Sequence, residues 1–175
     1  MSSIDLVILG MLLEKPQSAY DLQKDVEYHH LSRWTKISVP SIYKKVLQLK
    51  EKGYLQSQSI KGNKLAEKVL YTITKEGKEY FDQLMNTYAE QQISFLFDFN
   101  VVIANLNKME KNEALVLIEK LQKNICLSTE KVQSYEADYT DIPLVAKTIF
   151  EQQRRLYHCL SQWLDHFHSQ FKGAK

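Results

Sequence analysis

Residues 41–55, SIYKKVLQLKEKGYL, are the most informative part of this sequence. An apolar stripe runs along them at intervals of four and three residues, formed by Ile42, Val46 and Leu49. This spacing places the three side chains on one side of a helix and leaves the opposite side polar and partly basic. Upstream, Ser38 and Pro40 favour a helix start with Ser38 as the N-cap, and Gly53 favours a helix end. The stretch therefore predicts an amphipathic helix with one buried and one basic face.

Two more helices are predicted before this stretch. Ser3 can cap a short helix over about residues 4–13, which is apolar nearly all round and should be buried on more than one side. After a turn at residues 14–17, Ser18 is placed to cap a second helix with an apolar face. That face is formed by Ala19, Leu22 and Val26.

A β-hairpin is predicted after the basic helix. Polar and apolar residues alternate over residues 54–60 and again over residues 69–73, which is the period of a strand. The connecting segment contains Gly62-Asn63, a pair suited to the positive φ angles of a tight turn. It also carries three lysines, Lys61, Lys64 and Lys68.

The rest of the chain is expected to be helical. Thr74 is placed to cap a long helix, with Gly77 as a weak point in its first turns. The apolar periodicity of this helix continues through Phe95 and Phe99 to Leu106. Residues 93–103 hold too many apolar side chains for one side of a lone helix, so another subunit is expected to cover them.

Two further helices are predicted over residues 112–137 and 144–171, because apolar side chains recur there mostly at three- and four-residue intervals. Residues 138–143 form a short linker between them. A linker of this length makes the two helices an antiparallel pair.

The net charge differs between the part of the chain up to the end of the predicted hairpin and the helical part that follows. Residues 1–75 contain 12 Lys and Arg against 7 Asp and Glu, whereas residues 76–175 contain 11 against 14. A net charge of +5 in the first part and −3 in the second suggests that the first part binds a polyanion. We therefore expect a DNA-binding domain over residues 1–75 and a helical dimerisation domain over residues 76–175.

The order of elements is that of a winged helix-turn-helix: three helices plus a β-hairpin wing, in a chain that is mainly α. In this arrangement the third helix enters the major groove of double-stranded DNA and the wing reaches the flanking phosphates. The expected DNA-binding residues are Ser38, Ser41, Tyr43, Lys44, Lys45, Gln48, Lys61, Lys64 and Lys68.

Several motifs resemble the PadR family of bacterial transcriptional regulators, and the resemblance extends over essentially the whole chain. They include Ser41-Ile42-Tyr43, Lys52-Gly53-Tyr54-Leu55 and Leu70-Tyr71-Thr72-Ile73-Thr74. The length and helical C-terminal half are most like the phenolic-acid-repressor branch. The resemblance implies a homodimer that binds a palindromic operator, often as a repressor released by a small molecule. Ala19 and Pro40 depart from the residues common in the family, which could shift the start of the third helix.

An effector would have to be small and aromatic or apolar, given the aromatic side chains of the C-terminal half. A pocket between the winged domain and the helical arm is predicted to use Tyr88, Phe95, Phe99 and Trp163. Aromatic side chains at helical spacing are more often core or interface, and this second interpretation stays open. Tyr43 likewise has two interpretations, a phosphate contact or packing against the hairpin, and the lysines could be solvated surface charge.

Other classes of protein find little support. The sequence has no nucleophile motif and no glycine-rich phosphate loop, so we expect neither an enzyme nor a cofactor. His158, His166 and His168 lack metal-ligand spacing, and Cys126 and Cys159 lie within helical patterns. No leader or membrane-spanning segment is recognised, which favours the cytoplasm. A winged-helix module that binds protein instead of DNA remains the main alternative.

Overall fold

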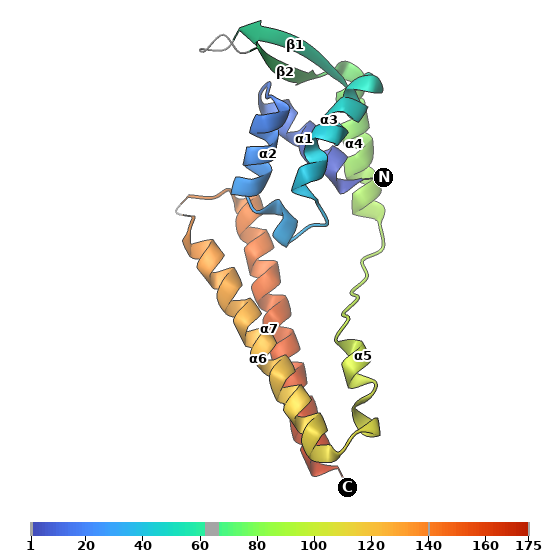
Figure 1. Cartoon of the computed structure of the whole chain (residues 1–175), viewed down its shortest axis with the longest axis vertical. Coiled ribbons are helices and arrows are strands. Elements are labelled where there is room, and N and C mark those ends of the chain that lie inside the picture. Colours follow the sequence, from blue (N-terminus) through green and yellow to red (C-terminus); the bar gives the residue numbers. More distant parts are fainter. Residues whose placement is uncertain (1, 62–66, 140, 175) are drawn as a thin grey trace. The chain divides into compact units, whose positions relative to one another are not determined.

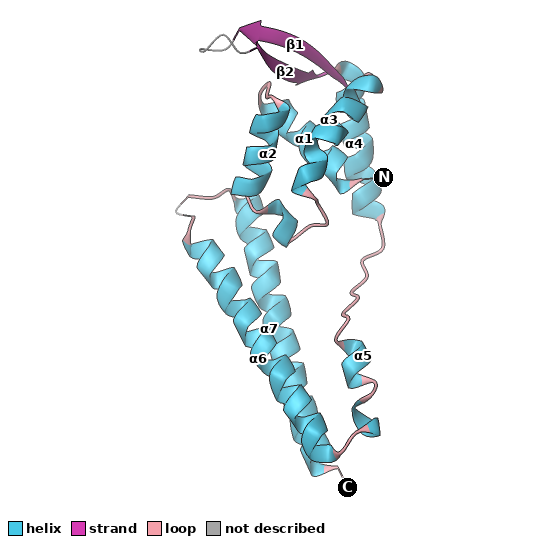
Figure 2. Cartoon of the chain, in the orientation of Figure 1, coloured by secondary structure: helices cyan, strands magenta, loops and turns pink. Residues whose placement is uncertain are grey.

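The computed structural model describes residues 2–61, 67–139 and 141–174. It divides into two compact units, an N-terminal unit over Met1–Ile93 and a C-terminal unit over Ser94–Lys175 (Figure 1). Helices predominate in both units. The strands of the described residues form one two-stranded antiparallel sheet (Figure 2).

The N-terminal unit has the element order predicted from the sequence. It comprises α1 (Ser3–Glu14), α2 (Ala19–Tyr28), α3 (Ile42–Glu51), β1 (Leu55–Lys61), β2 (Glu67–Ile73) and α4 (Lys75–Glu90), with short 3₁₀ turns at Leu31–Arg33 and Val39–Ser41. Three helices followed by a hairpin form a winged helix-turn-helix, which confirms the predicted fold class.

One apolar core holds these elements together. The predicted stripe of α3 is fully buried, at 0% exposure for Ile42 and Val46 and 1% for Leu49. It packs with the predicted face of α2 and with buried residues of α1, which include Ile8 and Leu9. Apart from Ser3, Asp5 and Glu14, the side chains of α1 are apolar on every side of the helix, so this helix can be buried between several neighbours.

Helix boundaries follow local chemistry. Ser18 caps α2 with a capping box, in which its hydroxyl accepts from Asp21 N–H at 3.2 Å and its own N–H donates to Asp21 Oδ2. Ser38 occupies the N-cap position of a 3₁₀ turn without a side-chain capping bond, and α3 begins only at Ile42, four residues after the predicted cap. Pro40 lies in this 3₁₀ turn. Gly53 ends α3 with φ 79°, a conformation that favours glycine.

The hairpin pairs Leu55 with Ile73 at its base and Lys61 with Glu67 at its far end. A single bridge between Gln17 and Tyr71 adds the segment before α2 to the edge of β2. The predicted Gly62-Asn63 turn lies outside the described residues.

The prediction of a helix reaching Leu106 is wrong. Helix α4 ends at Glu90, and the chain is irregular until the short helix α5 (Asn100–Ile103). Phe95, Phe97 and Phe99 occur at every second position, and their rings stack on one another with centroids 6.3 and 5.2 Å apart. Alternation with a period of two suits extended backbone better than a helix.

Helix α4 packs in the N-terminal unit, and the two compact units meet in sequence after Ile93. Leu84 is fully buried in the core of that unit, and Phe81 packs against it. The rings of Tyr54 and Tyr80 stack with centroids 4.3 Å apart. The stacked pair joins α4 to the segment between α3 and β1, and α4 also packs against α1, which sequence periodicity alone does not reveal.

The C-terminal unit is built on an antiparallel pair of long helices, α6 (Lys111–Ala137) and α7 (Leu144–Gly173), as predicted. Gln122 donates to Asp165 at 2.6 Å and Arg154 pairs with Glu136, so early residues of one helix meet late residues of the other. Their core includes Ile118 and Leu164. Among the described residues, no helix is both long and apolar enough to cross a bilayer.

Candidate nucleic-acid interface

The outward face of α3 presents polar and basic side chains to solvent. Tyr43 and Lys44 are exposed, and Gln48 and Ser41 are half-buried at the edges of the face. Ser38 is exposed in the preceding 3₁₀ turn, where its carbonyl accepts from the Ser41 hydroxyl. The structure therefore places these five predicted residues along one helix and its N-terminal turn.

Lys45 is placed differently from the others. Its Nζ lies 3.1 Å from Oδ1 of Asp5, a carboxylate of α1 whose side chain is only 6% exposed. Because Lys45 lies at the edge of the buried stripe, its side chain can reach the neighbouring helix. Its positive charge is thus already paired within the protein.

The wing lysines also differ among themselves. Lys68 on β2 forms an ion pair with Asp21 of α2, with Nζ and Oδ2 2.8 Å apart. This hydrogen bond is the main cause that lowers the pKa of Asp21, with Ser18 contributing and partial burial opposing it. Lys64 lies outside the described residues, and the side chain of Lys61 is not described either.

Sequence reasoning missed two surface features near α3. Leu47 is 52% exposed on the outward face of α3, where an apolar side chain could contact the methyl group of thymine. It could have been noticed because it falls outside the stripe of residues 42, 46 and 49. On α2, the Lys24 ammonium lies 4.6 Å from the ring centroid of Tyr20, which is itself 54% exposed.

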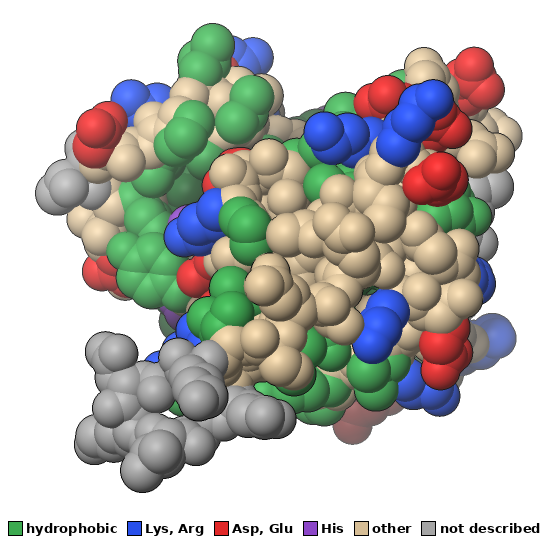
Figure 3. Space-filling model, turned by 90° about the horizontal axis from the view of Figure 1, so that it is seen from above, with side chains coloured by type: hydrophobic (Ala, Val, Ile, Leu, Met, Phe, Trp, Pro, Cys, Tyr) green, Lys and Arg blue, Asp and Glu red, His purple; other side chains and the backbone are tan. Residues whose placement is uncertain are grey.

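The surface charge is mixed. The space-filling view shows Lys and Arg side chains interspersed with Asp and Glu (Figure 3). An interface built here would combine a few cations with hydrogen-bonding side chains such as Gln48 and Tyr43. Side chains of this kind on an amphipathic helix can contact both phosphates and base edges in a major groove.

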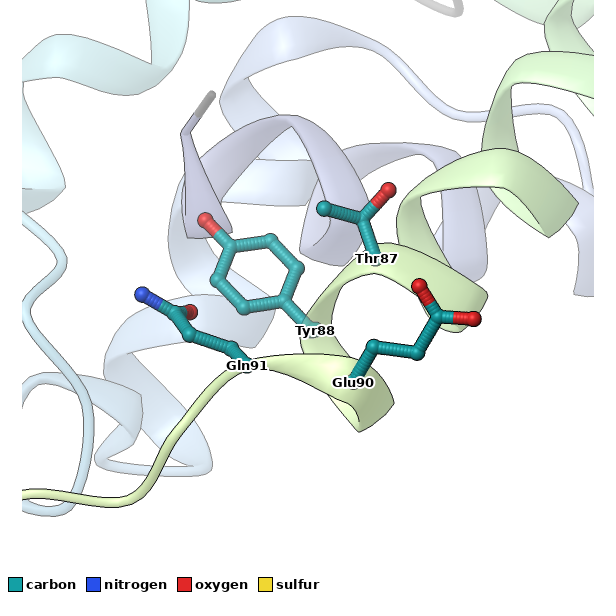
Figure 4. A pocket seen from close by; sticks show the side chains of 4 residues that line it. All are labelled: Thr87, Tyr88, Glu90 and Gln91. Carbon is teal, nitrogen blue, oxygen red and sulfur yellow. The ribbon is translucent and has the colours of Figure 1, made fainter.

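The predicted effector residues divide between the two units. Tyr88 belongs to the N-terminal unit and lines an open hollow of about 400 Å³ at the end of α4, together with Thr87, Glu90 and Gln91 (Figure 4). Tyr88 also packs against the core of that unit. The other three lining side chains are polar, so the hollow is only partly aromatic.

Phe95, Phe99 and Trp163 lie in the C-terminal unit, in a row of ring contacts that we call the aromatic row. It runs Phe95, Phe97, Phe99, Trp163, Phe167 and Phe171, with successive centroids 5.2 to 6.3 Å apart. Phe95 is 62% and Trp163 38% exposed, so the row is open to solvent at both residues. Both predicted roles, ligand contact and packing, are compatible with this exposure.

The described residues contain no group of three or more His, Cys, Asp or Glu side chains placed to hold a metal ion. Cys126 and Cys159 are free and exposed thiols, without a disulfide between them.

A helical unit with a β-hairpin wing and an exposed polar face on its third helix belongs to the winged helix-turn-helix class. Residues 8–83, from α1 to α4, match the transcriptional regulator PadR-like family. The chain therefore carries a PadR-like domain, as the sequence resemblance predicted. The family is one of transcriptional regulators, which agrees with the expectation that the chain is not an enzyme.

Solved structures share this fold over nearly the whole chain. Bacillus subtilis PadR in complex with operator DNA matches with a TM-score of 0.81 and 16% identity, covering 97% of this chain and 99% of that one. The same protein in complex with p-coumaric acid matches with a TM-score of 0.80 and 17% identity, covering 98% and 99%.

The Vibrio cholerae virulence activator AphA matches with a TM-score of 0.69 and 16% identity, covering 97% of this chain and 98% of that one. At these identities the likeness establishes a common fold. No curated protein sequence matched the chain.

Proposed function

We propose that this protein is a sequence-specific DNA-binding transcriptional regulator that represses its target genes. The observation that carries the proposal is the outward face of α3 in a PadR-like winged helix-turn-helix. Ser41, Tyr43, Lys44 and Gln48 occupy that face, while the apolar stripe behind them is fully buried. The likeness to PadR with operator DNA supports the same assignment.

The regulator acts as a homodimer on a palindromic operator. Two recognition helices held about 34 Å apart, one turn of DNA, would read two half-sites. Exposed apolar side chains of the C-terminal unit support association, among them Val101 at 67%, Leu144 at 78% and Val145 at 74% exposure. We place the regulator in the cytoplasm, where a bacterial regulator meets DNA.

A small aromatic effector releases the operator. The aromatic row and Tyr88 offer ring faces for it, and the likeness to PadR with p-coumaric acid makes that compound the first probe. A ligand with about 1 to 3 kcal/mol of preference for the non-binding conformation would change DNA affinity 5- to 150-fold.

The first experiment is a fluorescence-anisotropy titration of the chain against its own upstream promoter and a scrambled duplex of equal length, at two salt concentrations. We expect tighter binding to the promoter, weakening as salt rises because counterion release is lost. Equal affinity for both duplexes contradicts sequence specificity. Binding to neither contradicts the proposed function.

Two substitutions separate the roles assigned to the face. Lys44→Ala should weaken binding to both duplexes alike, because a phosphate contact carries no sequence information. Gln48→Ala should change the preference among base pairs of the promoter. If both variants act alike on both duplexes, the division into phosphate and base contacts is wrong.

A further inference from the structure

Asp5 is a buried carboxylate that the proposed DNA contact does not use. It lies in the first turn of α1, and the residue as a whole is 4% exposed beside the buried side chain of Ile4. A carboxylate removed from water is unfavourable unless a positive charge or hydrogen bonds compensate for the lost hydration. The compensation has to come from groups packed against α1.

Lys45 supplies the opposite charge. Its Nζ lies 3.1 Å from Asp5 Oδ1, and no described side chain or backbone group hydrogen bonds to that oxygen with good geometry. The lysine side chain is 28% exposed, whereas its neighbour Lys44 is fully on the exposed face. The ion pair is therefore the main compensation for the buried Oδ1.

The same carboxylate also acts on α4. Burial raises the pKa of Tyr80, and the negative charge of Asp5 raises it further. Asp5 thus interacts with α3 through Lys45 and with α4 through Tyr80. The hydrophobic effect that buries the stripe of Ile42, Val46 and Leu49 has no directionality of its own. An ion pair to a buried carboxylate depends on direction and distance, and therefore adds a restraint on the rotation of α3.

We propose that Asp5 is a positioning residue for the recognition helix. It holds Lys45 away from DNA and fixes the rotation of α3, so that Ser41, Lys44 and Gln48 face the groove. The inference rests on the proposed function, since it concerns how α3 meets DNA. The inference concerns Asp5 and Lys45, and neither residue is substituted in the DNA-binding experiments described above.

Adjacent lysines of one helix provide the matched test. Lys44→Met and Lys45→Met are compared by the slope of log affinity against log salt concentration for the promoter duplex. Removing a phosphate contact lowers the steepness of this slope by about one. We expect that loss for Lys44→Met and an unchanged slope for Lys45→Met.

For Lys45→Met and for Asp5→Asn we expect the ratio of promoter to scrambled affinity to fall about 2- to 30-fold, the range for residues that act through others. Equal losses of slope for the two lysine variants overturn the inference, because Lys45 would then contact phosphate as Lys44 does.

A stability control separates positioning from folding. Asp5→Leu combined with Lys45→Met removes both charges, and such apolar replacement of a buried pair commonly retains or restores stability. The urea midpoint of the double variant should exceed that of Lys45→Met, which leaves Asp5 unpaired. Its promoter preference should nevertheless stay low.

Promoter preference that recovers together with the urea midpoint would make the pair purely structural and overturn the inference. If the wild-type chain binds neither duplex, the proposed function fails and the inference fails with it. If the wild type prefers the promoter but the two lysine variants do not differ in salt dependence as expected, the inference fails and the proposed function stands.

Discussion

Among the described glycines, Gly77 is the one where an added side chain would meet the closest neighbours. A Cβ at this position would overlap the carbonyl oxygen of Tyr54 and would lie 2.8 Å from Cγ1 of Ile73. Its N–H donates to Thr74 Oγ1 at 3.0 Å, and Thr74 in turn donates to the carbonyl of Gly53. The start of α4 therefore approaches the backbone that leads from α3 into β1.

The first prediction is that Gly77→Ala destabilises the chain by about 1 to 3 kcal/mol, as overpacking does. Backbone must shift to admit the methyl group, because the nearest atom is a carbonyl oxygen. Urea unfolding of both proteins measures the change. Gly173→Ala is the matched control, since no atom lies within 4 Å of its added Cβ. A Gly77→Ala midpoint equal to that of the control would contradict the close approach.

At the scale of single elements, α2 depends on its capping box. The Ser18 hydroxyl accepts from Asp21 N–H and also donates to Asp21 Oδ2 at 2.8 Å. The residue before α1, Ser2, has no such side-chain bond. The two serines therefore occupy equivalent positions with different contacts.

The second prediction is that Ser18→Ala lowers the free energy of unfolding by about 1 kcal/mol, the usual cost of losing a cap. Ser2→Ala should change it less. Thermal unfolding followed by circular dichroism compares the two variants, and equal shifts would contradict a stabilising role for the capping box.

The wing is joined to α2 by Lys68 and Asp21, and this link depends on pH. The pKa of Asp21 is lowered in the folded chain, chiefly by its hydrogen bond with Lys68. A carboxyl whose folded pKa is lowered stabilises the fold above its ordinary pKa of about 3.9. The stabilisation is lost as the pH falls through the lower folded-state value.

The third prediction concerns Asp21→Asn. At pH 6 the variant should be less stable than the wild type by about 0.5 to 1 kcal/mol, a small value because both partners are partly exposed. The difference should shrink as the pH falls below about 3.9. Urea unfolding at a series of pH values tests this, and a difference that does not vary with pH would refute it.

At the scale of the whole molecule, the long helices of the C-terminal unit leave many apolar side chains in water. Helix α7 has 30 residues. Among its described residues, only Leu164 is fully buried. A pair of helices with so much exposed apolar surface is expected to associate.

The fourth prediction is that the chain sediments at equilibrium as a species of twice 20.5 kDa at micromolar concentration. The fragment comprising residues 1–93 should sediment as a monomer and bind the promoter more weakly, because it presents one recognition helix at a time. A full chain that stays monomeric under these conditions would remove the basis for reading a palindrome.

The fifth prediction concerns the effector. Isothermal titration with p-coumaric acid and a panel of related phenolic acids should give saturable heat, and binding should lower affinity for the promoter. Trp163→Ala should weaken binding of the acid, because its ring stacks within the aromatic row. Absence of heat with every compound would leave the regulator without this effector class.

The sequence by itself determined the order and type of the elements from α1 to β2, and of the helix pair α6 and α7. Helical and strand periodicity are local properties, so the stripe of α3, the hairpin and the antiparallel pair α6 and α7 could be predicted from spacing. The Ser18 cap could also be predicted, because its partner Asp21 is three residues away. The composition of the exposed face of α3 follows from the same spacing.

Contacts between residues far apart in the chain were decided only by the tertiary structure. Lys45 has the same charge as Lys44 and lies on the same helix, yet only Lys45 is paired with Asp5, 40 positions earlier. Gly77 reads as a weak point in a helix until the carbonyl of Tyr54 is seen beside it. The end of α4 at Glu90 and its packing on the first unit were likewise missed. The physical reason is that burial and charge pairing depend on which elements are neighbours, and spacing along one element carries no record of its neighbours.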